Sequence, residues 1–169
     1  MSAANRILRN FALFFDGVGY AGNAEKVTPP TLALILEQYK AGGLDMSLPI
    51  DMGMEDMVLK FTLNDLGADA ISTFGVLGGP DFTANLKGAL QNLDGSVESV
   101  LVSARGKVKS VTPSEWIAGQ KANHEYEIAC TYYRYEVDGT TVIEIDVPNM
   151  IRRINGVDQL STIRAAMGL

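Results

Sequence analysis

Three Asp-Gly pairs constrain the fold of this chain more than any other feature. They are Asp16-Gly17, Asp94-Gly95 and Asp138-Gly139, and each lies between stretches rich in β-branched and aromatic residues. Asp-Gly suits the centre of a two-residue hairpin loop, because a type I′ turn needs positive φ at both central positions. The sequence therefore predicts three antiparallel hairpins and a mainly β fold.

The third hairpin can be given a register from its turn. If Val137 pairs with Thr140, the two strands acquire one mostly apolar face and one polar face, as a half-buried sheet requires. The apolar face would then pair Tyr132 with Ile145, Arg134 with Ile143 and Cys130 with Val147; the polar face would pair Thr131 with Asp146 and Tyr133 with Glu144.

Further strands and two helices complete the expected elements. The strands are predicted at Thr31–Glu37, Met57–Leu63 and Ser96–Val111. The main helix is predicted for LGADAISTFGVL, with Asn64 or Asp65 as its N-cap and Gly78-Gly79-Pro80 as its stop. A short second helix is predicted over Asp158–Met167, after a turn at Asn155-Gly156.

The composition fits one globular domain and limits its partners. With 169 residues, 47% of them hydrophobic and 20% charged, the chain can bury a core of its own. Residues 1–169 are therefore expected to form a single-domain antiparallel β-sandwich or barrel with one flanking helix and a short C-terminal helix. A net charge of -6 argues against a protein that grips nucleic-acid phosphates, because such proteins are usually basic.

The first residues and the cysteine content bear on the compartment. Arg6 and Arg9 precede a short apolar run, Phe11–Phe15, which Asp16 ends, so neither a signal peptide nor a membrane span is expected. The single cysteine, Cys130, excludes an intrachain disulfide and a cysteine-based metal site. The chain is therefore expected to fold in a reducing cytoplasm.

The sequence carries no pattern typical of a catalytic or cofactor-binding site. The only histidine, His124, is interpreted as an edge or surface residue, and Cys130 as a structural thiol on an apolar face. The glycines of Gly17–Gly22 follow a hairpin turn and open no helix, unlike a dinucleotide-binding loop. Acidic residues without the order of a calcium-binding loop follow at Asp45, Asp51, Glu55 and Asp56. No catalytic residue, cofactor or metal is predicted.

One segment, Lys40–Asp56, lacks the pattern of a regular element and yet is rich in methionine. Its large apolar residues fall on alternate positions, as in a strand: Leu44, Met46, Leu48, Ile50, Met52 and Met54. Glycine and proline are expected to interrupt any ladder there, at Gly42, Gly43, Pro49 and Gly53. The segment could fold back over its own sheet or pack against another copy of the chain. The second interpretation is favoured, because flexible methionines suit a surface that adapts to a partner.

Two long stretches resemble a known family. EQYKAGGLDMSLPIDMGMED (Glu37–Asp56) and EVDGTTVIEIDVPNMIRRINGVDQLSTIRAAMGL (Glu136–Leu169) are similar to the major tail tube protein of contractile-tailed phages. The likeness is closest to the tube subunit of R-type bacteriocins, the pyocins. FFDGVGYAG near the start and PSEWIAGQKA (Pro113–Ala122) extend it over almost the whole chain, while residues 64–99 match more loosely.

The resemblance implies a structural subunit of the inner tube of a contractile tail, not an enzyme. Hexameric rings of such subunits stack into a hollow rigid tube, and strands of neighbouring copies join into one barrel around the lumen. A contracting sheath drives the tube through the target envelope, which opens a channel for ions in a bacteriocin or for DNA in a phage.

The resemblance also implies partners and a location. The expected partners are further copies of the chain, the contractile sheath protein, baseplate and tube-terminator proteins, and a length-determining tape-measure protein. DNA would be only a passing cargo, and the target membrane would be met only on penetration. The tube is expected to assemble in the bacterial cytoplasm and to leave the cell in an extracellular particle.

Particular residues acquire roles from the resemblance. Lys40–Asp56 becomes an inter-subunit arm that reaches the adjacent ring, and Asn155–Leu169 and the N-terminal segment add contacts. Within the arm, close backbone contact is assigned to Gly42, Gly43 and Gly53, and buried area to Leu44, Met46, Leu48, Ile50, Met52 and Met54. Glu144 and Asp146, on the predicted polar face, are hypothetical lumen-lining residues of an acidic wall that favours cations.

Three other functions stay open at this point. A type VI secretion ring protein is also a small β-barrel that forms hexameric rings, but the arm and the NGVDQL terminus favour the phage-type tube. A small ligand-binding β-barrel would line a cavity with the apolar positions and would be a monomer stabilised by a hydrophobic ligand. An enzyme ranks last, because its activity would have to survive the loss of His124.

Overall fold

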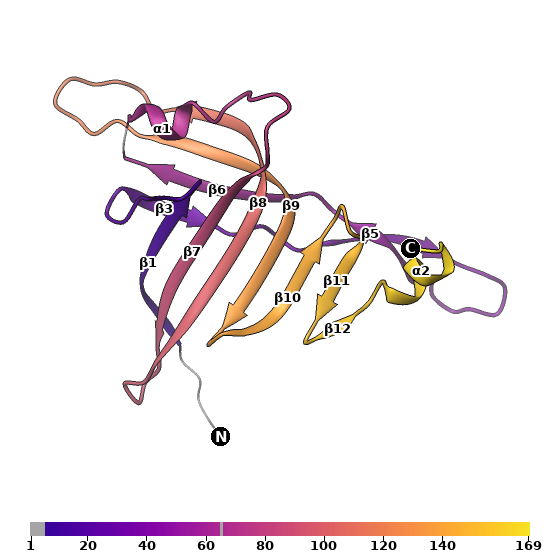
Figure 1. Ribbon diagram of the computed structural model, residues 1–169. Coiled ribbons are helices and arrows are strands. Elements are labelled where there is room, and N and C mark those ends of the chain that lie inside the picture. Colours follow the sequence, from indigo (N-terminus) through magenta and orange to yellow (C-terminus); the bar gives the residue numbers. More distant parts are fainter. Residues whose placement is uncertain (1–5, 65) are drawn as a thin grey trace.

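The computed structural model describes residues 6–64 and 66–169, and this part of the chain is mainly antiparallel strand (Figure 1). The strands are β1 (Ile7–Phe15), β2 (Val18–Gly19), β3 (Ala24–Thr28), β4 (Leu34–Tyr39), β5 (Leu48–Met54), β6 (Met57–Leu63), β7 (Phe82–Gln91), β8 (Val97–Pro113), β9 (His124–Val137), β10 (Thr140–Asp146), β11 (Ile151–Ile154) and β12 (Val157–Asp158). The helices of the described residues, α1 (Ala68–Ile71) and α2 (Ser161–Ala166), are short. The predicted mainly β, antiparallel fold is confirmed.

A ten-stranded sheet organises the molecule. Its main path runs β12-β11-β10-β9-β8-β7-β1-β2, and β6, which also pairs with β3, joins it through β9. β8 accompanies β9 along nearly its whole length, while the other edge of β9 pairs first with β6 and then with β10. The change of partner falls at Thr131, between the β6-paired Cys130 and the β10-paired Tyr132. The sheet divides there, and β6 and β3 turn over toward β1.

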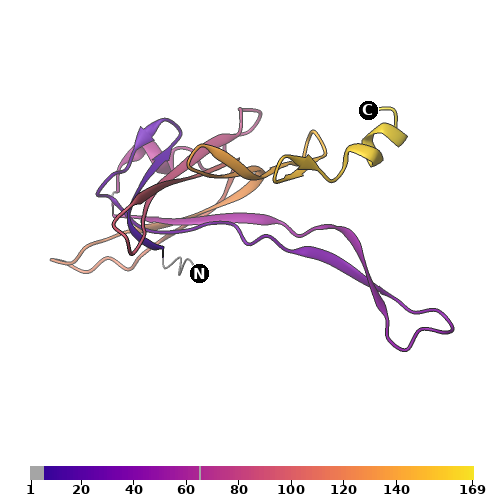
Figure 2. The ribbon, with the colours of Figure 1, turned by 90° about the horizontal axis from the view of Figure 1, so that it is seen from below.

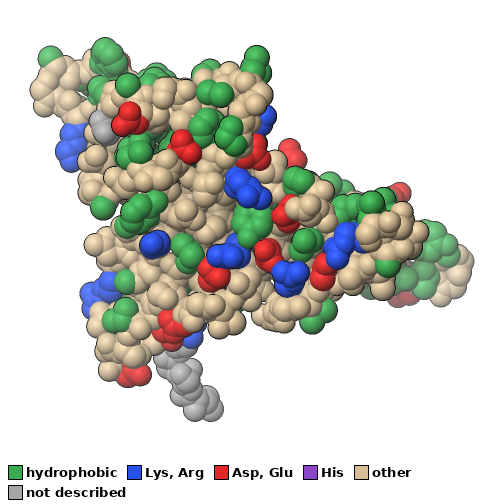
Figure 3. All heavy atoms as spheres, in the orientation of Figure 1, with side chains coloured by type: hydrophobic (Ala, Val, Ile, Leu, Met, Phe, Trp, Pro, Cys, Tyr) green, Lys and Arg blue, Asp and Glu red, His purple; other side chains and the backbone are tan. Residues whose placement is uncertain are grey.

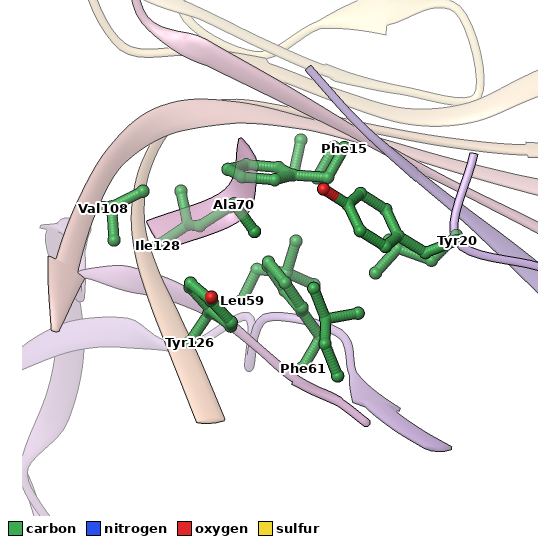
Figure 4. Packing of buried hydrophobic residues seen from close by; sticks show 12 residues of the cluster. Phe15, Tyr20, Leu59, Phe61, Ala70, Val108, Tyr126 and Ile128 are labelled. Carbon is green, nitrogen blue, oxygen red and sulfur yellow. The ribbon is translucent and has the colours of Figure 1, made fainter. Parts of the chain in front are cut away.

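The main core fills the space that this division encloses. Its largest fully buried side chains are Leu13, Phe15, Leu59, Phe61, Leu63, Tyr126 and Ile128. Phe61 stacks on Tyr126 with ring centroids 5.1 Å apart and meets Phe15 at 5.3 Å. Figure 4 shows these rings turned toward one another among the other core side chains. Burial of each side chain of this size stabilises the fold by about 1.5–3 kcal/mol.

A second, smaller core cluster lies where the end of β5 and the start of β6 meet strands β8, β9 and β10 of the sheet. It contains Met57, Val102, Tyr133 and Ile145. The partly buried Met54 packs against it, so the end of β5 is held to the body. Burial raises the pKa of the Tyr133 hydroxyl to about 12. Cys130 packs against both clusters, in agreement with the prediction of a structural thiol.

All three predicted Asp-Gly hairpins form, although one turn differs in type. Asp16 and Asp138 have positive φ (48° and 46°), and each is followed by a glycine of positive φ, as a type I′ turn requires. At the third pair, only Gly95 has positive φ, and Asn92 donates its backbone N–H to the Ser96 carbonyl oxygen at 2.9 Å. That loop has three residues and a left-handed glycine, so the predicted two-residue turn is wrong there.

The predicted register of the last hairpin is also wrong beyond its turn. Val137 pairs with Thr140 as expected, but a register shift follows between Thr141 and Ile143. The observed pairs are Tyr135–Ile143, Arg134–Glu144, Tyr133–Ile145 and Tyr132–Asp146. Because one extra residue reverses the face of every later side chain, Tyr133 joins the core instead of the polar face, and Tyr132 and Arg134 leave the apolar one.

The predicted main helix shrinks to one turn, while most other bounds agree within a few residues. α1 has Gly67 at its N-cap, and the predicted cap Asp65 lies outside the described residues. The Thr73 hydroxyl donates to the Ala70 carbonyl oxygen at 2.6 Å, and Gly75 has φ 76°. These local alternatives end the helix early, because hydroxyl side chains compete for backbone groups and a left-handed glycine leaves the helical path. α2 lies within the predicted Asp158–Met167.

Candidate functional site

β4 and β5 form a separate two-stranded sheet that projects from the body as a hairpin (Figure 2). Tyr39 pairs with Leu48, and the turn between them covers residues 40–47. Pro49 pairs with Gln38, and Gly53 sits where the register shifts, with φ 123°. The expected interruption of the ladder is therefore wrong, because the bulge absorbs the glycine and the pairing continues around the proline.

Both faces of this hairpin expose apolar side chains, and Leu34 and Leu36 of β4 lie on one of them. Because side chains alternate along a strand, the residues at alternate positions of β4 and β5 share a face. The other face, called here the outer hairpin face, carries Ile35, Tyr39, Leu48, Ile50 and Met52, with Glu37 opposite Ile50. Leu48, Ile50 and Met52 are 50%, 44% and 57% exposed. Large apolar side chains gathered on a projecting element are typical of an interaction surface.

The structure separates the residues predicted for the arm. Leu48, Ile50 and Met52 lie together on the outer hairpin face, as the alternation indicated. Four other predicted arm residues lie in the turn between β4 and β5: Gly42, Gly43, Leu44 and Met46. In this turn, Met46 is exposed and Leu44 is half-buried. Met54 faces the second core cluster instead. The inter-subunit role of these residues stays a prediction.

Sequence reasoning missed the contribution of β4. Ile35, Leu36 and Tyr39 are each about half-exposed and lie opposite or beside the predicted arm residues. The apolar run at residues 32–36 predicted a strand but gave no sign that its partner was the methionine-rich segment. Only the pairing of β4 with β5 brings the two stretches into one surface.

An ion pair connects the hairpin to the far end of the chain. Asp51 in β5 accepts a hydrogen bond at Oδ2 from Arg152 Nη2 in β11, at 2.7 Å. Its Oδ1 accepts the backbone N–H of Gly53 at 2.8 Å. The side-chain hydrogen bond from Arg152, and then the Gly53 N–H, lower the pKa of the Asp51 carboxyl. One carboxylate therefore holds both the bulge and β11.

The sheet itself has a polar face across its central strands, called here the polar sheet face. Paired residues lie on the same face, so Ser103, Arg134, Glu144, Arg153 and Asp158 form one row from β8 to β12. Neighbouring rows add Lys87, Arg105, Glu136 and Asp146. Figure 3 shows basic and acidic side chains interspersed over this part of the molecule. The face is balanced in charge.

Glu144 and Asp146 occupy different environments on the polar sheet face. Glu144 forms an ion pair with Arg153 and accepts a hydrogen bond from the Tyr132 hydroxyl at 3.1 Å. Burial, and then the bond to Glu144, raise the pKa of Tyr132. Asp146 is buried and accepts from Asn149, through the backbone N–H at 3.2 Å and the side-chain amide at 2.8 Å. Asp146 therefore holds the turn at residues 147–150, and Glu144 is the more available carboxylate.

The residues considered for chemistry lie apart. His124 is buried at the start of β9, beside Tyr126. The predicted edge or surface position of this histidine is therefore wrong. It belongs to the end of the core because Leu63 and Pro113 flank it as strand partners. Burial raises the pKa of the Cys130 thiol, which makes it a poorer nucleophile. In the described part of the chain, His, Cys, Asp and Glu do not form a group that could hold a metal ion.

Two further observations concern membranes and ligands. Among the described residues, no helix combines the length and apolar character needed to cross a bilayer. The enclosed core is occupied by aromatic and aliphatic side chains of the chain itself (Figure 4). That packing gives no support to a ligand-binding barrel with an open apolar cavity.

The arrangement of the hairpin and the sheet defines a class of protein. A strand-rich body carries a projecting hairpin with exposed apolar side chains and a broad polar sheet face. These are the features of a structural protein that associates through its surfaces. The chain belongs to the phage tail tube protein FII family, whose model matches residues 5–168.

Individual relatives agree with this assignment. The chain is 32% identical to the tail tube protein of Escherichia phage P2 over 171 residues, which cover 99% of each chain. It is 29% identical to the major tail tube protein of Serratia phage KSP20, with 96% of this chain and 95% of the relative covered. The resemblance to tail tube proteins is confirmed. The chain is a structural tail tube subunit and not an enzyme.

A solved structure shares the fold at low sequence identity. A chain of the PVC extracellular contractile injection system, solved as a sheath-tube complex in the extended state, superimposes with a TM-score of 0.57. The two sequences are 12% identical, and the match covers 75% of this chain and 88% of the other. The likeness supports the assignment of the fold.

Proposed function

We propose that this subunit forms hexameric rings that stack into a hollow tube, with the outer hairpin face buried against a neighbouring copy. The observation that carries the proposal is the β4–β5 hairpin itself. Its exposed Leu48, Ile50 and Met52 form an apolar face on an element that projects away from the body. An isolated two-stranded ribbon is marginally stable in water, so such a hairpin gains stability when a partner covers its apolar face.

The edges of the large sheet support ring formation. Within the described residues, β2 pairs only with Phe14 and Phe15, so no strand covers the outer edge of β1 from Ile7 to Ala12. The other end of the sheet is the two-residue strand β12. Open edges at opposite ends of one sheet favour head-to-tail pairing between copies, and ring closure leaves no edge free to aggregate. The polar sheet face would then line the lumen.

The charge of the polar sheet face modifies the expected acidic wall. Arg134, Arg153 and Lys87 alternate there with Glu136 and Glu144, and Arg134–Glu136 and Arg153–Glu144 are ion pairs. Paired charges attract DNA phosphates less than free arginines do, so a passing polyanion would not be held. Glu144 remains a lumen-lining candidate. Asp146 is a weaker one, because Asn149 encloses its carboxylate.

The assembled tube would act by mechanics. The sheath-tube complex of the PVC system supports a contractile sheath as partner, and baseplate, tube-terminator and tape-measure proteins complete the proposed set. The tube would be assembled in the bacterial cytoplasm and leave it in a virion or bacteriocin particle, where it passes DNA or ions. A type VI-like ring protein remains the alternative for the same fold.

Negative-stain electron microscopy of the purified protein tests this function with a matched pair of variants. Ile50→Asp places a charge on the outer hairpin face, and Gln38→Asp places the same charge on the opposite face. We expect tubes from the wild type and from Gln38→Asp, and no tubes from Ile50→Asp, with circular dichroism confirming that both variants fold. Equal tube formation by both variants would exclude the outer hairpin face as an interface. Monomers of the wild type at every concentration would contradict a self-assembling tube.

A further inference from the structure

The contact between Asp51 and Arg152 differs from an ordinary surface ion pair. The Arg152 side chain is only 18% exposed and that of Asp51 38%. In the sheet, Arg152 lies opposite Ile145, in a row that continues through Tyr133 and Ala104. A guanidinium on this apolar side of the sheet needs a carboxylate close by, because a half-buried charge without a partner is costly.

The carboxylate that meets this need comes from the hairpin. β4 and β5 share no ladder with the ten-stranded sheet in the described residues, and Met54 is their point of packing on the second core cluster. Beyond Met54, the side chain of Asp51 reaches β11 from a position two residues before the bulge glycine. Of the ion pairs between described residues, this is the one that joins the hairpin to the body.

We propose that the Asp51–Arg152 pair is a latch that sets the direction of the β4–β5 hairpin in the unassembled subunit. Apart from its base, where Glu55 donates its backbone N–H to the Ala33 carbonyl oxygen at 2.9 Å, the hairpin packs on the body at Met54, and a two-stranded ribbon held only there can swing. The latch adds an anchor on β11, farther along the ribbon than its base, and an anchor away from the base fixes an angle that the base alone does not. The bond from Gly53 to the same carboxylate makes the bulge, and so the twist of the ribbon, part of the latch.

The inference rests on the proposed function in one respect: a fixed hairpin is useful only if a neighbouring copy receives it. An element held in its bound direction loses less conformational freedom when it docks, so it associates more readily than a swinging one. The latch also connects the hairpin to β11, the strand that contributes Arg153 to the polar sheet face. The orientation of the hairpin is then set by the part of the subunit proposed to surround the lumen.

The hairpin direction can be measured directly in dilute, unassembled protein. Spin labels at Met46→Cys in the turn and Ser161→Cys in α2, in a Cys130→Ser background, report the distance between the two elements by double electron–electron resonance. We expect one narrow distribution for the parent protein and a broad one for Asp51→Ala or Arg152→Met. Asp45→Ala, the same change elsewhere in the hairpin, should keep the narrow distribution. The exchanged pair Asp51→Arg with Arg152→Asp should restore it.

The outcomes separate the latch from the proposed function. A narrow distribution in both Asp51→Ala and Arg152→Met, with the fold intact by circular dichroism, would overturn the latch whatever the tubes do. Broad distributions together with unchanged rates of tube formation would overturn the role of the latch in assembly. Ile50→Asp, in contrast, should keep the narrow distribution and lose the tubes, because it affects the interface and leaves the latch intact.

Discussion

Gly106 lies directly against the backbone of Ala129, at the point where β8 shifts its register on β9. A Cβ atom at Gly106 would come within 1.9 Å of the Ala129 carbonyl oxygen. The register shift between Arg105 and Gly106 coincides with Thr131, where β9 exchanges β6 for β10 as its neighbour. The close approach of two backbones therefore permits the division of the sheet that encloses the core.

Replacement of this glycine should be costly. We expect Gly106→Ala to lower the free energy of unfolding by about 3 kcal/mol or more, the upper end of the range typical of overpacking. The reason is that the obstacle is backbone and cannot rotate away. Urea denaturation measures the change. Gly42→Ala is the matched control, since a Cβ atom at Gly42 would meet nothing within 4 Å. Equal stabilities of the two variants would show that the strands separate there at little cost.

The aromatic stack predicts a second large effect. Phe61→Ala removes the ring that stacks on Tyr126 and contacts Phe15, and it should lower the free energy of unfolding by about 3–5 kcal/mol. Phe74→Ala makes the same change at a side chain that is 55% exposed, and should cost less than about 0.5 kcal/mol. Thermal and urea denaturation compare the two. A similar loss in both would mean that the core is not centred on Phe61.

The C-terminal segment should be sensitive to acid. The side-chain hydrogen bond from Arg164, followed by the backbone N–H of Leu160, lowers the pKa of Asp158 below the ordinary aspartate value. Since this carboxyl has a lower pKa in the folded state, its contribution to stability is complete above the ordinary aspartate pKa. The contribution is lost as the pH falls through the depressed value.

Carboxyl carbon NMR can follow that titration at Asp158. We expect its midpoint to lie below the ordinary aspartate range in the wild type and to rise in Arg164→Met. The protection factors of the α2 amides against hydrogen exchange should fall over the same pH interval. An unchanged midpoint in Arg164→Met would show that the ion pair, at 2.7 Å, is not what holds the segment.

Conduction tests the proposed lumen. Glu144→Lys places a cation beside Arg153 and Tyr132, and if the polar sheet face lines the channel, cation conductance of the assembled tube should fall. Glu115→Lys, in the exposed loop between β8 and β9, is the control with the same change of charge. Planar-bilayer recordings of intact particles compare the two. Identical conductance would remove Glu144 from the lumen.

Features that depend on adjacent residues, such as turns, could be predicted from the sequence. Features that depend on a distant strand, such as bulges, could not. The turns at Asp16 and Asp138 were predictable because two residues determine a type I′ turn. The bulges near Val142, Thr131 and Gly53 were not, since an extra residue is accommodated only by the strand opposite it. Because the bulge after Thr141 is not visible in the sequence, the predicted register places Tyr133 and Arg134 on the wrong faces.

The candidate site likewise has one part that the sequence predicts and one part that it does not. The alternation of Leu48, Ile50 and Met52 was visible in the sequence and matches their common face. The strand partner β4 does not follow from the sequence, because Pro49 and Gly53 predict a broken ladder. The contact of Asp51 with Arg152 spans 101 residues of sequence and depends on where β11 lies, which no local pattern records.

The central claim is that the outer hairpin face contacts another copy of the chain, and site-specific cross-linking in assembled tubes tests it most directly. A photoreactive amino acid replaces Ile50, or Gln38 as the control on the opposite face, in tubes made from equal amounts of light and heavy-nitrogen-labelled protein. Mass spectrometry of the cross-linked peptides should find light–heavy pairs from position 50 and few from position 38. Cross-links from position 50 that join only peptides of the same label would place this face against its own chain and contradict the account.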